Sequence, residues 1–178
     1  MDDLVDLQAV VSREKVMRFL PEGIMSPGEV NEVLKWVIEC YGKNRPERII
    51  KFTVAVELNA KPGLVGWCGL GPLDFRPSEI EIFCGLSDEF WGRGYALEAV
   101  RAIIYFGFET IKLRNIVAVV DPRNFASKKL VEKMGMVFQE CVSNLPDEHK
   151  FYEGFHLYFI DRDVFAKVRT CLKGRDYG

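Results

Sequence analysis

Apolar residues recur at roughly helical intervals along the first part of the chain. In residues 3–19 this pattern runs until Pro21 and Gly23 interrupt it, which predicts one or two short helices. A second helix is predicted to begin at Ser26, because Ser26 and Glu29 form a capping box with a proline at the first helical position. The apolar stripe of this helix ends near Gly42.

Residues 50–86 carry patterns that are typical of β-strands. Residues 50–58 and 64–70 are β-rich and flank a turn, so they predict a hairpin. A loop is expected around Pro72, Pro77 and Ser78. Residues 79–86 predict a central strand with one mixed face, because two sets of side chains alternate along it: Ile80, Ile82 and Cys84 against Glu79, Glu81 and Phe83.

Helical and strand patterns alternate through the second half of the chain. Residues 94–111 predict a long helix that is apolar almost all round and therefore buried against a sheet. Residues 114–120 predict a strand covered on both faces, and residues 124–134 a helix closed by Gly135. The remaining predicted elements are strands at 136–142 and 151–160 and a last helix at 161–172 with Asp161 as its N-cap.

Composition favours one globular domain spanning residues 1–178 in the cytoplasm. Hydrophobic residues make up 48% of the chain, which is ample for one core. Lys and Arg total 24 against 26 for Asp and Glu, and this balance argues against nucleic acid as the main partner. No apolar run approaches the ~20 residues of a membrane helix, and the acidic start is unlike a signal peptide. The five cysteines lack C-x-x-C and zinc-ligand spacing, which predicts reduced thiols and no metal site.

A glycine-rich turn at residues 90–96 lies between a predicted strand and a predicted helix. Glycines let the backbone approach a ligand, and the start of a helix presents unpaired N–H groups, so the turn predicts an anion site to which Arg93 adds a cation. Glycine also serves tight turns without any ligand, so a purely structural role stays open. A dinucleotide fingerprint is not favoured, because Leu97 stands at the third glycine position, and no Lys-Ser or Lys-Thr pair follows as a nucleoside triphosphate site would need.

Two segments resemble the GNAT acetyltransferase superfamily, in its ribosomal-protein (RimJ/RimL-like) branch. Residues 90–99, FWGRGYALEA, are similar to the acetyl-CoA signature [QR]-x-x-G-x-[GA], with Trp91 at the Gln/Arg position and Gly94 and Ala96 as the small residues. Residues 121–136, DPRNFASKKLVEKMGM, are similar to the segment N-x-x-S-x-x-[LV]-x-E-K-x-G-[FM] of that family. The resemblance covers residues 4–160.

The resemblance implies an α+β GNAT fold with a mixed, mostly antiparallel sheet flanked by helices. Its two central parallel strands, here 79–86 and 114–120, splay apart and admit acetyl-CoA. A backbone amide at residues 84–86 would stabilise the oxyanion of the thioester. The implied cofactor-binding residues are Gly85, Leu86, Asn124 and Ser127 toward the pantetheine and thioester end, and Trp91, Gly92, Arg93, Gly94, Tyr95 and Ala96 toward the pyrophosphate.

Two side chains are candidates for catalysis by the same resemblance. Many members carry a proton-donating tyrosine where this chain has Val131, so Ser127 is expected to protonate the departing thiolate; a helix-capping role for Ser127 is the alternative. Glu81 is expected to deprotonate the acceptor amine through water, with a solvated strand carboxylate as the alternative. An acyl-cysteine at Cys84 is less favoured than a buried apolar role, because no histidine has a recognisable relation to it.

The acceptor is expected to be an amine attacked directly in a ternary complex. At pH 7 an α-amine with a pKa of ~8 costs about 1.4 kcal/mol to neutralise, whereas a lysine-like amine at ~10.4 costs over ~4 kcal/mol. With an uncertain base, this favours a protein N-terminal α-amine over a small polyamine or antibiotic amine. Asp147 and Glu148 are candidates to attract a cationic acceptor, or are merely exposed loop charges. A catalytically silent CoA-binding module and a plain α/β interaction domain stay open.

The chain departs from the family pattern at its start. The usual fold opens with a strand before the first helix, and residues 1–5 are too short to supply one. Residues 50–58 would then form a sheet edge with unpaired backbone groups. Either another subunit, which would make a homodimer, or the C-terminal segment 161–178 is expected to cover that edge.

Overall fold

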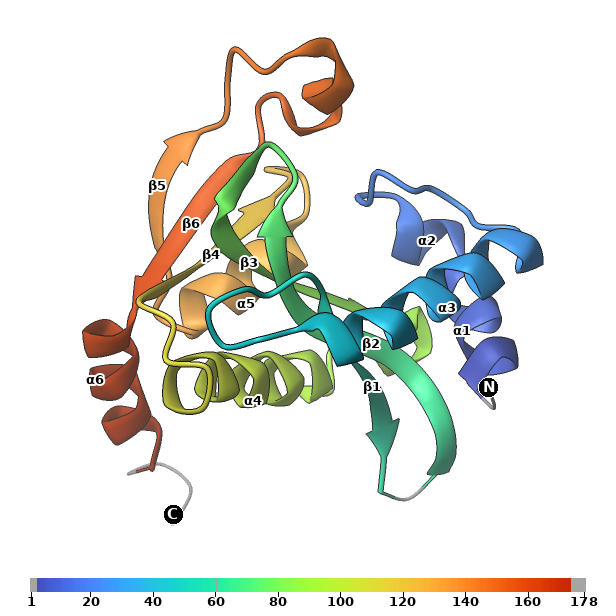
Figure 1. Ribbon diagram of the computed structural model, residues 1–178. Coiled ribbons are helices and arrows are strands. Elements are labelled where there is room, and N and C mark those ends of the chain that lie inside the picture. The colour runs from blue at the N-terminus through green and yellow to red at the C-terminus, as the bar shows by residue number, and fades with distance from the viewer. Residues whose placement is uncertain (1–2, 60, 174–178) are drawn as a thin grey trace.

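In the part of the chain that the computed structural model describes, six strands form one sheet in the order β1-β2-β3-β4-β6-β5 (Figure 1). The structure describes residues 3–59 and 61–173. The helices are α1 (Asp3–Val11), α2 (Glu14–Met17), α3 (Pro27–Lys43), α4 (Tyr95–Glu109), α5 (Phe125–Lys133) and α6 (Arg162–Lys173), with 3-10 helices η1 (Asp88–Phe90) and η2 (Asp147–Tyr152). The strands are β1 (Phe52–Leu58), β2 (Lys61–Leu73), β3 (Arg76–Leu86), β4 (Asn115–Val120), β5 (Val137–Cys141) and β6 (His156–Asp161).

The sheet consists of two antiparallel halves that meet at a parallel pair. Strands β1, β2 and β3 pair antiparallel in one half, and β4, β6 and β5 do so in the other. Between the halves, β3 and β4 run parallel and share one register pair, Glu81 with Val117. The strands separate beyond this pair, which confirms the expected mixed sheet with splayed central strands.

Helix α4 packs on the sheet through a continuous apolar face, as its sequence predicts. Val100, Ile104 and Phe108 are buried against Leu70 and Ile116 in the main core. Burying side chains of this size stabilises the fold by ~1.5–3 kcal/mol each. The main core therefore fixes where α4 starts, and with it the glycine turn that precedes the helix.

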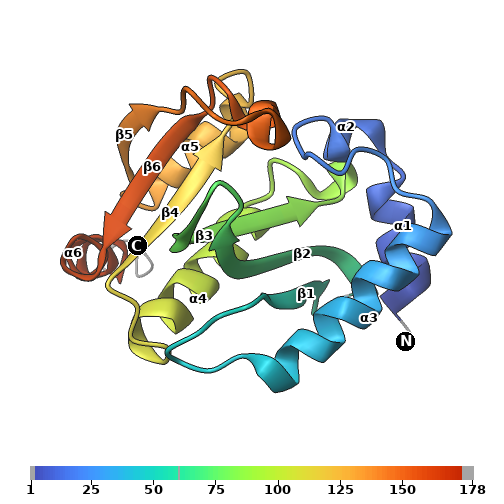
Figure 2. The same ribbon diagram turned by 45° about the horizontal axis from the view of Figure 1, so that its top comes forward.

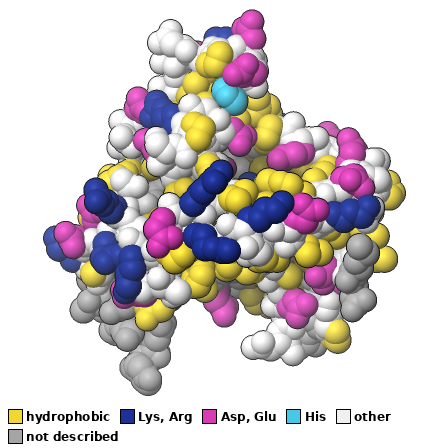
Figure 3. All heavy atoms as spheres, in the orientation of Figure 1, with side chains coloured by type: hydrophobic (Ala, Val, Ile, Leu, Met, Phe, Trp, Pro, Cys, Tyr) yellow, Lys and Arg dark blue, Asp and Glu magenta, His cyan; other side chains and the backbone are white. Residues whose placement is uncertain are grey.

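The N-terminal helices form a second, smaller core with β2 beside β1 (Figure 2). The capping box at the start of α3 is confirmed: the Ser26 N–H donates to the Glu29 carboxylate at 2.7 Å, and the Glu29 N–H donates to Ser26 Oγ at 3.4 Å. None of the described helices has the length and apolar content that a membrane span requires. Basic and acidic side chains are interspersed on the face shown in Figure 3, in line with the nearly balanced composition.

Two predicted boundaries are wrong. The loop expected around Pro72 and Pro77 is a continuation of the β2–β3 hairpin, since β2 runs to Leu73 and β3 starts at Arg76. The register shifts between Pro72 and Leu73, and such irregularities accommodate proline in a sheet. The strand expected at 151–160 begins only at His156, because the preceding residues turn through η2 and a glycine with φ of 82°.

Strand β1 lies at one edge of the sheet, and no strand precedes α1 within the described residues. The end of α3 covers part of this edge, since the Tyr41 hydroxyl donates to the Thr53 carbonyl. Helix α6 lies beside β6 instead, with the Arg162 guanidinium donating to the Phe108 carbonyl at 2.8 Å (Figure 1). The expectation that the C-terminal segment covers β1 is therefore wrong for residues 162–173, and residues 174–178 lie outside the described part. Cover by another subunit stays a prediction.

Candidate active site

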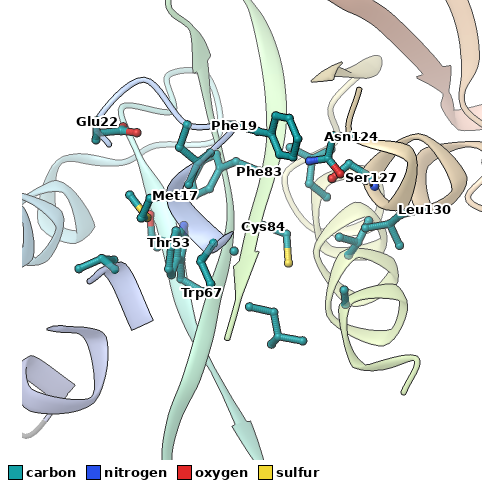
Figure 4. Close-up of a pocket in the computed structure, with 18 of the residues that line it drawn as sticks. Met17, Phe19, Glu22, Thr53, Trp67, Phe83, Cys84, Asn124, Ser127 and Leu130 are labelled. Carbon is teal, nitrogen blue, oxygen red and sulfur yellow. Dashed lines mark hydrogen bonds between the residues drawn. The ribbon is translucent and has the colours of Figure 1, made fainter. Parts of the chain in front are cut away.

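A cavity of about 1090 Å³ opens where β3 and β4 separate. Figure 4 places Cys84, Asn124 and Ser127 on the side of β3 that faces α4 and α5, and Glu22 and Trp67 on the other side. The glycine turn before α4 and the start of α5 line one part of the cavity, and the loop after α2, the β2–β3 turn and η2 line another. The cavity can therefore hold two ligands that approach β3 from opposite sides and meet beside it.

The glycine turn has the backbone geometry of an anion site. Gly92 and Gly94 have φ of 75° and 86°, in the left-handed region that favours glycine. A Cβ at either position would meet no other atom within 4 Å, so the space above the turn is open. Gly94 is the N-cap of α4 and supplies no side-chain cap, which leaves the first N–H groups of the helix for a ligand. These features fit a bound pyrophosphate, and Gly92, Gly94, Tyr95 and Ala96 all line the cavity.

The Trp91 and Arg93 side chains beside these glycines make different contacts. The Trp91 indole N–H donates to the Leu86 carbonyl at 2.7 Å, which ties the turn to the end of β3 and occupies a backbone group expected to face the pantetheine. Arg93 is exposed and does not line the cavity, and its guanidinium lies over the Phe90 ring at 5.7 Å. The sequence also missed the basic residues that do line the cavity, namely Lys15, Arg18, Lys51, Arg123, Lys129 and Lys133.

Asn124 and Ser127 lie together at the start of α5. The Ser127 N–H donates to the Asn124 side-chain oxygen at 3.1 Å, so Asn124 is the N-cap of this helix. The Ser127 side chain lines the cavity, and its hydroxyl has no hydrogen-bond partner in the described part of the chain. The cap therefore belongs to Asn124, and the Ser127 hydroxyl is free to face a ligand.

Glu81 lies at the point where β3 and β4 begin to separate. Its carboxyl lines the cavity on the mixed face of β3 and accepts no hydrogen bond from any residue that the structure describes. Burial raises the pKa of Glu81 to about 7, Lys51 opposes this rise, and Asp74 and Glu22 add to it. Glu81 is therefore partly buried and carries a raised pKa, unlike a fully solvated strand carboxylate.

The side of the cavity formed by the loop after α2, the β2–β3 turn and η2 carries two carboxylates and a tyrosine. The Tyr152 hydroxyl donates to Asp74 Oδ2 at 2.7 Å, and burial together with this contact raises the pKa of Tyr152. Glu22 reaches the same region from the loop after α2 (Figure 4). The sequence missed all three residues, because they come from a loop, a turn and a 3-10 helix. Asp147 and Glu148, which it proposed instead, are exposed and do not line the cavity.

Cys84 behaves as a small apolar residue. It stands opposite Cys68 in the β2–β3 register and packs against the main core. The contact with Cys84 and burial raise the pKa of the Cys68 thiol, so that thiol stays protonated. No histidine within the described residues lines the cavity: His149 lies near the Phe75 ring and His156 near Phe138. Within the described residues, no histidine is therefore placed to activate Cys84 for an acyl-cysteine.

A steric constraint that the sequence did not reveal requires glycine at position 85. A Cβ at this position would come within 2.3 Å of the Trp67 ring. The absence of a side chain thus lets Trp67 lie across β3 beside the cavity, and it leaves the Gly85 backbone open to a ligand on the cavity side.

A sheet that opens between two parallel strands, beside a glycine turn at the start of a buried helix, defines an acyl-CoA N-acyltransferase. A family model described as the acetyltransferase (GNAT) domain matches residues 1–137. The chain belongs to the GNAT acetyltransferase family, and it is an acetyl-CoA-dependent N-acetyltransferase.

Known relatives agree with this assignment. The uncharacterized N-acetyltransferase YnaD from Bacillus subtilis (strain 168) is 26% identical over 165 residues, which cover 89% of both chains. Spermidine N-acetyltransferase from Vibrio cholerae, solved with CoA and spermine, has a TM-score of 0.71 at 19% identity over 92% of both chains. The aminoglycoside acetyltransferase AAC(6')-Ib, solved with coenzyme A, has a TM-score of 0.73 at 19% identity over 94% of both chains. At these identities the two structures establish the shared fold, and the finer RimJ/RimL-like placement stays a prediction.

Proposed function

We propose that the protein transfers acetyl from acetyl-CoA to an amine by direct attack in a ternary complex, with Glu81 as general base and Ser127 as proton donor. The observation that carries the proposal is the position of Glu81. An unpaired, partly buried carboxyl with a pKa of about 7 lies inside the cavity where the central strands part. A base with a pKa near the working pH combines adequate basicity with a large deprotonated fraction.

In this proposal, different residues of the chain have different roles in acetyl transfer. Acetyl-CoA supplies an activated acetyl thioester, and the turn from Gly92 to Ala96 binds its pyrophosphate. Glu81 accepts a proton from the acceptor ammonium through water, which frees the nitrogen lone pair. A backbone N–H at residues 84–86 stabilises the carbonyl oxygen as the C–N bond forms. The Ser127 hydroxyl then donates a proton to the sulfur as the C–S bond breaks, and the second proton that the nitrogen loses on forming the amide returns to Ser127 through water.

The acceptor class follows from the charges near Glu81. The sequence favoured a protein N-terminal α-amine as the acceptor because the identity of a base was uncertain. With Glu81 as the base, this argument for an α-amine no longer holds. A more basic amine becomes accessible, and Glu22 and Asp74 supply negative charge beside the base. These features support a small cationic amine, such as a polyamine or an aminoglycoside, with the protein N-terminus as second candidate.

An acceptor panel tests the proposal. Release of free CoA is followed with DTNB for small polyamines, aminoglycosides and peptides with free N-termini. Turnover of at least one class is expected, with Glu81→Gln reducing kcat/KM by about 100-fold or more. The exposed Glu57→Gln is the matched control and should retain full activity. Tight acetyl-CoA binding without turnover of any amine would instead indicate a catalytically silent module.

A further inference from the structure

Lys51, the residue just before β1, stands in one row with Gly71 on β2 and Glu81 on β3. Leu70 pairs with Phe52 and Gly71 pairs with Glu81, so the β1–β2 register continues to place Lys51 opposite Gly71. The backbone of Lys51 is fixed there by Asn44, whose side-chain NH₂ donates to the Lys51 carbonyl at 2.7 Å and whose oxygen accepts from the Lys51 N–H at 3.2 Å. The start of the lysine side chain is therefore anchored two strands away from the carboxyl.

The Lys51 side chain extends toward Glu81 over Gly71, which has no side chain to block it. A Cβ at Gly71 would lie 3.0 Å from Lys51 Cδ and 3.6 Å from Lys51 Nζ, so the lysine side chain lies directly over this glycine. The ammonium ends 4.0 Å from the centroid of the Phe83 ring, which is two residues from Glu81 on the same face of β3. Its nitrogen forms no salt bridge with any residue that the structure describes.

The Tyr152 hydroxyl approaches Glu81 from η2 and stays uncharged, because its pKa is raised. The two acidic groups that face Glu81 oppose its ionisation: Asp74 from the β2–β3 turn and Glu22 from the loop after α2. Burial acts in the same direction. Lys51 is the cation among the groups that act on this carboxyl.

We propose that Lys51 is a positioning residue for catalysis: it lies across Gly71 and favours the deprotonated form of the Glu81 carboxyl against burial and the neighbouring carboxylates. This rests on the proposed function of Glu81 as the base. A base acts when deprotonated, so loss of the lysine charge moves the active range to higher pH.

A direct titration tests the proposal without any acceptor. Glu81 is followed in ¹³C-glutamate-labelled protein by NMR, and its resonance is assigned by its loss in Glu81→Gln. Lys51→Met is expected to raise the Glu81 midpoint by about one pH unit or more, and Lys51→Arg to leave it near the wild-type value. Lys43→Met, which removes a surface lysine paired with Glu39, is the matched control. An unmoved midpoint in folded Lys51→Met overturns the proposal.

Two further measurements separate charge from packing. Gly71→Ala places a methyl group against the lysine side chain and should shift the midpoint in the same direction by less. With an active acceptor, Lys51→Met should lower kcat/KM about tenfold below the midpoint and leave it near wild type at pH 9, as one pH unit implies. A uniform loss at every pH would indicate a structural role and contradict the proposal. If no amine is turned over, the proposed function fails, while the titration still decides the role of Lys51.

Discussion

Glu81 has opposite consequences for folding and for catalysis. Its pKa is raised from 4.5 to about 7 in the fold, so the folded state binds the proton more tightly than the unfolded chain. The stability from this proton is fully present below about pH 4.5 and is lost as the pH rises through 7. At 1.36 kcal/mol per pH unit, the loss is about 3 kcal/mol.

Glu81→Gln should therefore be more stable than wild type above pH 8, while its activity falls. The glutamine side chain carries no charge to bury, and the difference should shrink toward pH 5. Thermal unfolding of both proteins across this range measures it, with Glu57→Gln as the control. Equal pH profiles for the mutant and wild type would show that Glu81 titrates normally.

Ser127 and Asn124 make a matched pair, since one is assigned to chemistry and the other caps α5. Ser127→Ala should lower kcat by ~100-fold if the hydroxyl donates its proton in the rate-limiting step, with unchanged stability and CoA affinity. Asn124→Ala should cost about 1 kcal/mol of folding free energy. Steady-state kinetics, calorimetry and denaturant unfolding of both variants separate the roles. A destabilised Ser127→Ala with normal kcat would reverse the assignment.

The glycine turn tests cofactor binding at the scale of one element. Gly94 has φ of 86° and open space around it, so Gly94→Ala meets no clash but must adopt a left-handed conformation. That conformation costs ~1–2 kcal/mol, and CoA affinity should fall about five- to thirtyfold if the turn relaxes. Gly94→Glu adds a negative charge beside the phosphates and should abolish binding. Calorimetry with CoA measures both, and unchanged affinity in Gly94→Glu would exclude the turn as the phosphate site.

Elements whose residues share one regular pattern could be predicted from the sequence, and those built by contacts between distant segments could not. The capping box at Ser26 and the apolar helix after Gly94 carry their signals locally, so their positions were right. The residues that surround Glu81 carry no such signal. Asp74 lies near Glu81 because of the β2–β3 hairpin, which was predicted as a loop because it contains two prolines. Tyr152 lies there because of a 3-10 helix, which was predicted as part of a strand. Glu81 itself was identified by resemblance, but its burial and its neighbours became visible only in the fold.

At the scale of the whole molecule, the two halves of the sheet share few backbone contacts and are joined mainly by side-chain packing. They share one register pair between β3 and β4, and the helices and the cavity make up the rest of the junction. A ligand that binds between the strands should therefore hold the halves together. At a CoA concentration 100 times its Kd, the gain is ~2.7 kcal/mol, which for a chain of this size corresponds to a rise in Tm of roughly 5–11 °C.

Hydrogen exchange locates this stabilisation. CoA should slow exchange of the amides at residues 84–86 and 118–121, where the central strands diverge, and at 92–96 in the glycine turn. Amides in the β5–β6 pair, which lies outside the cavity, should respond less. Gly94→Glu should show neither the rise in Tm nor the protection. A rise in Tm with protection confined to β5 and β6 would place CoA elsewhere, because a ligand that bridges the two halves must first slow the opening of the strands it touches.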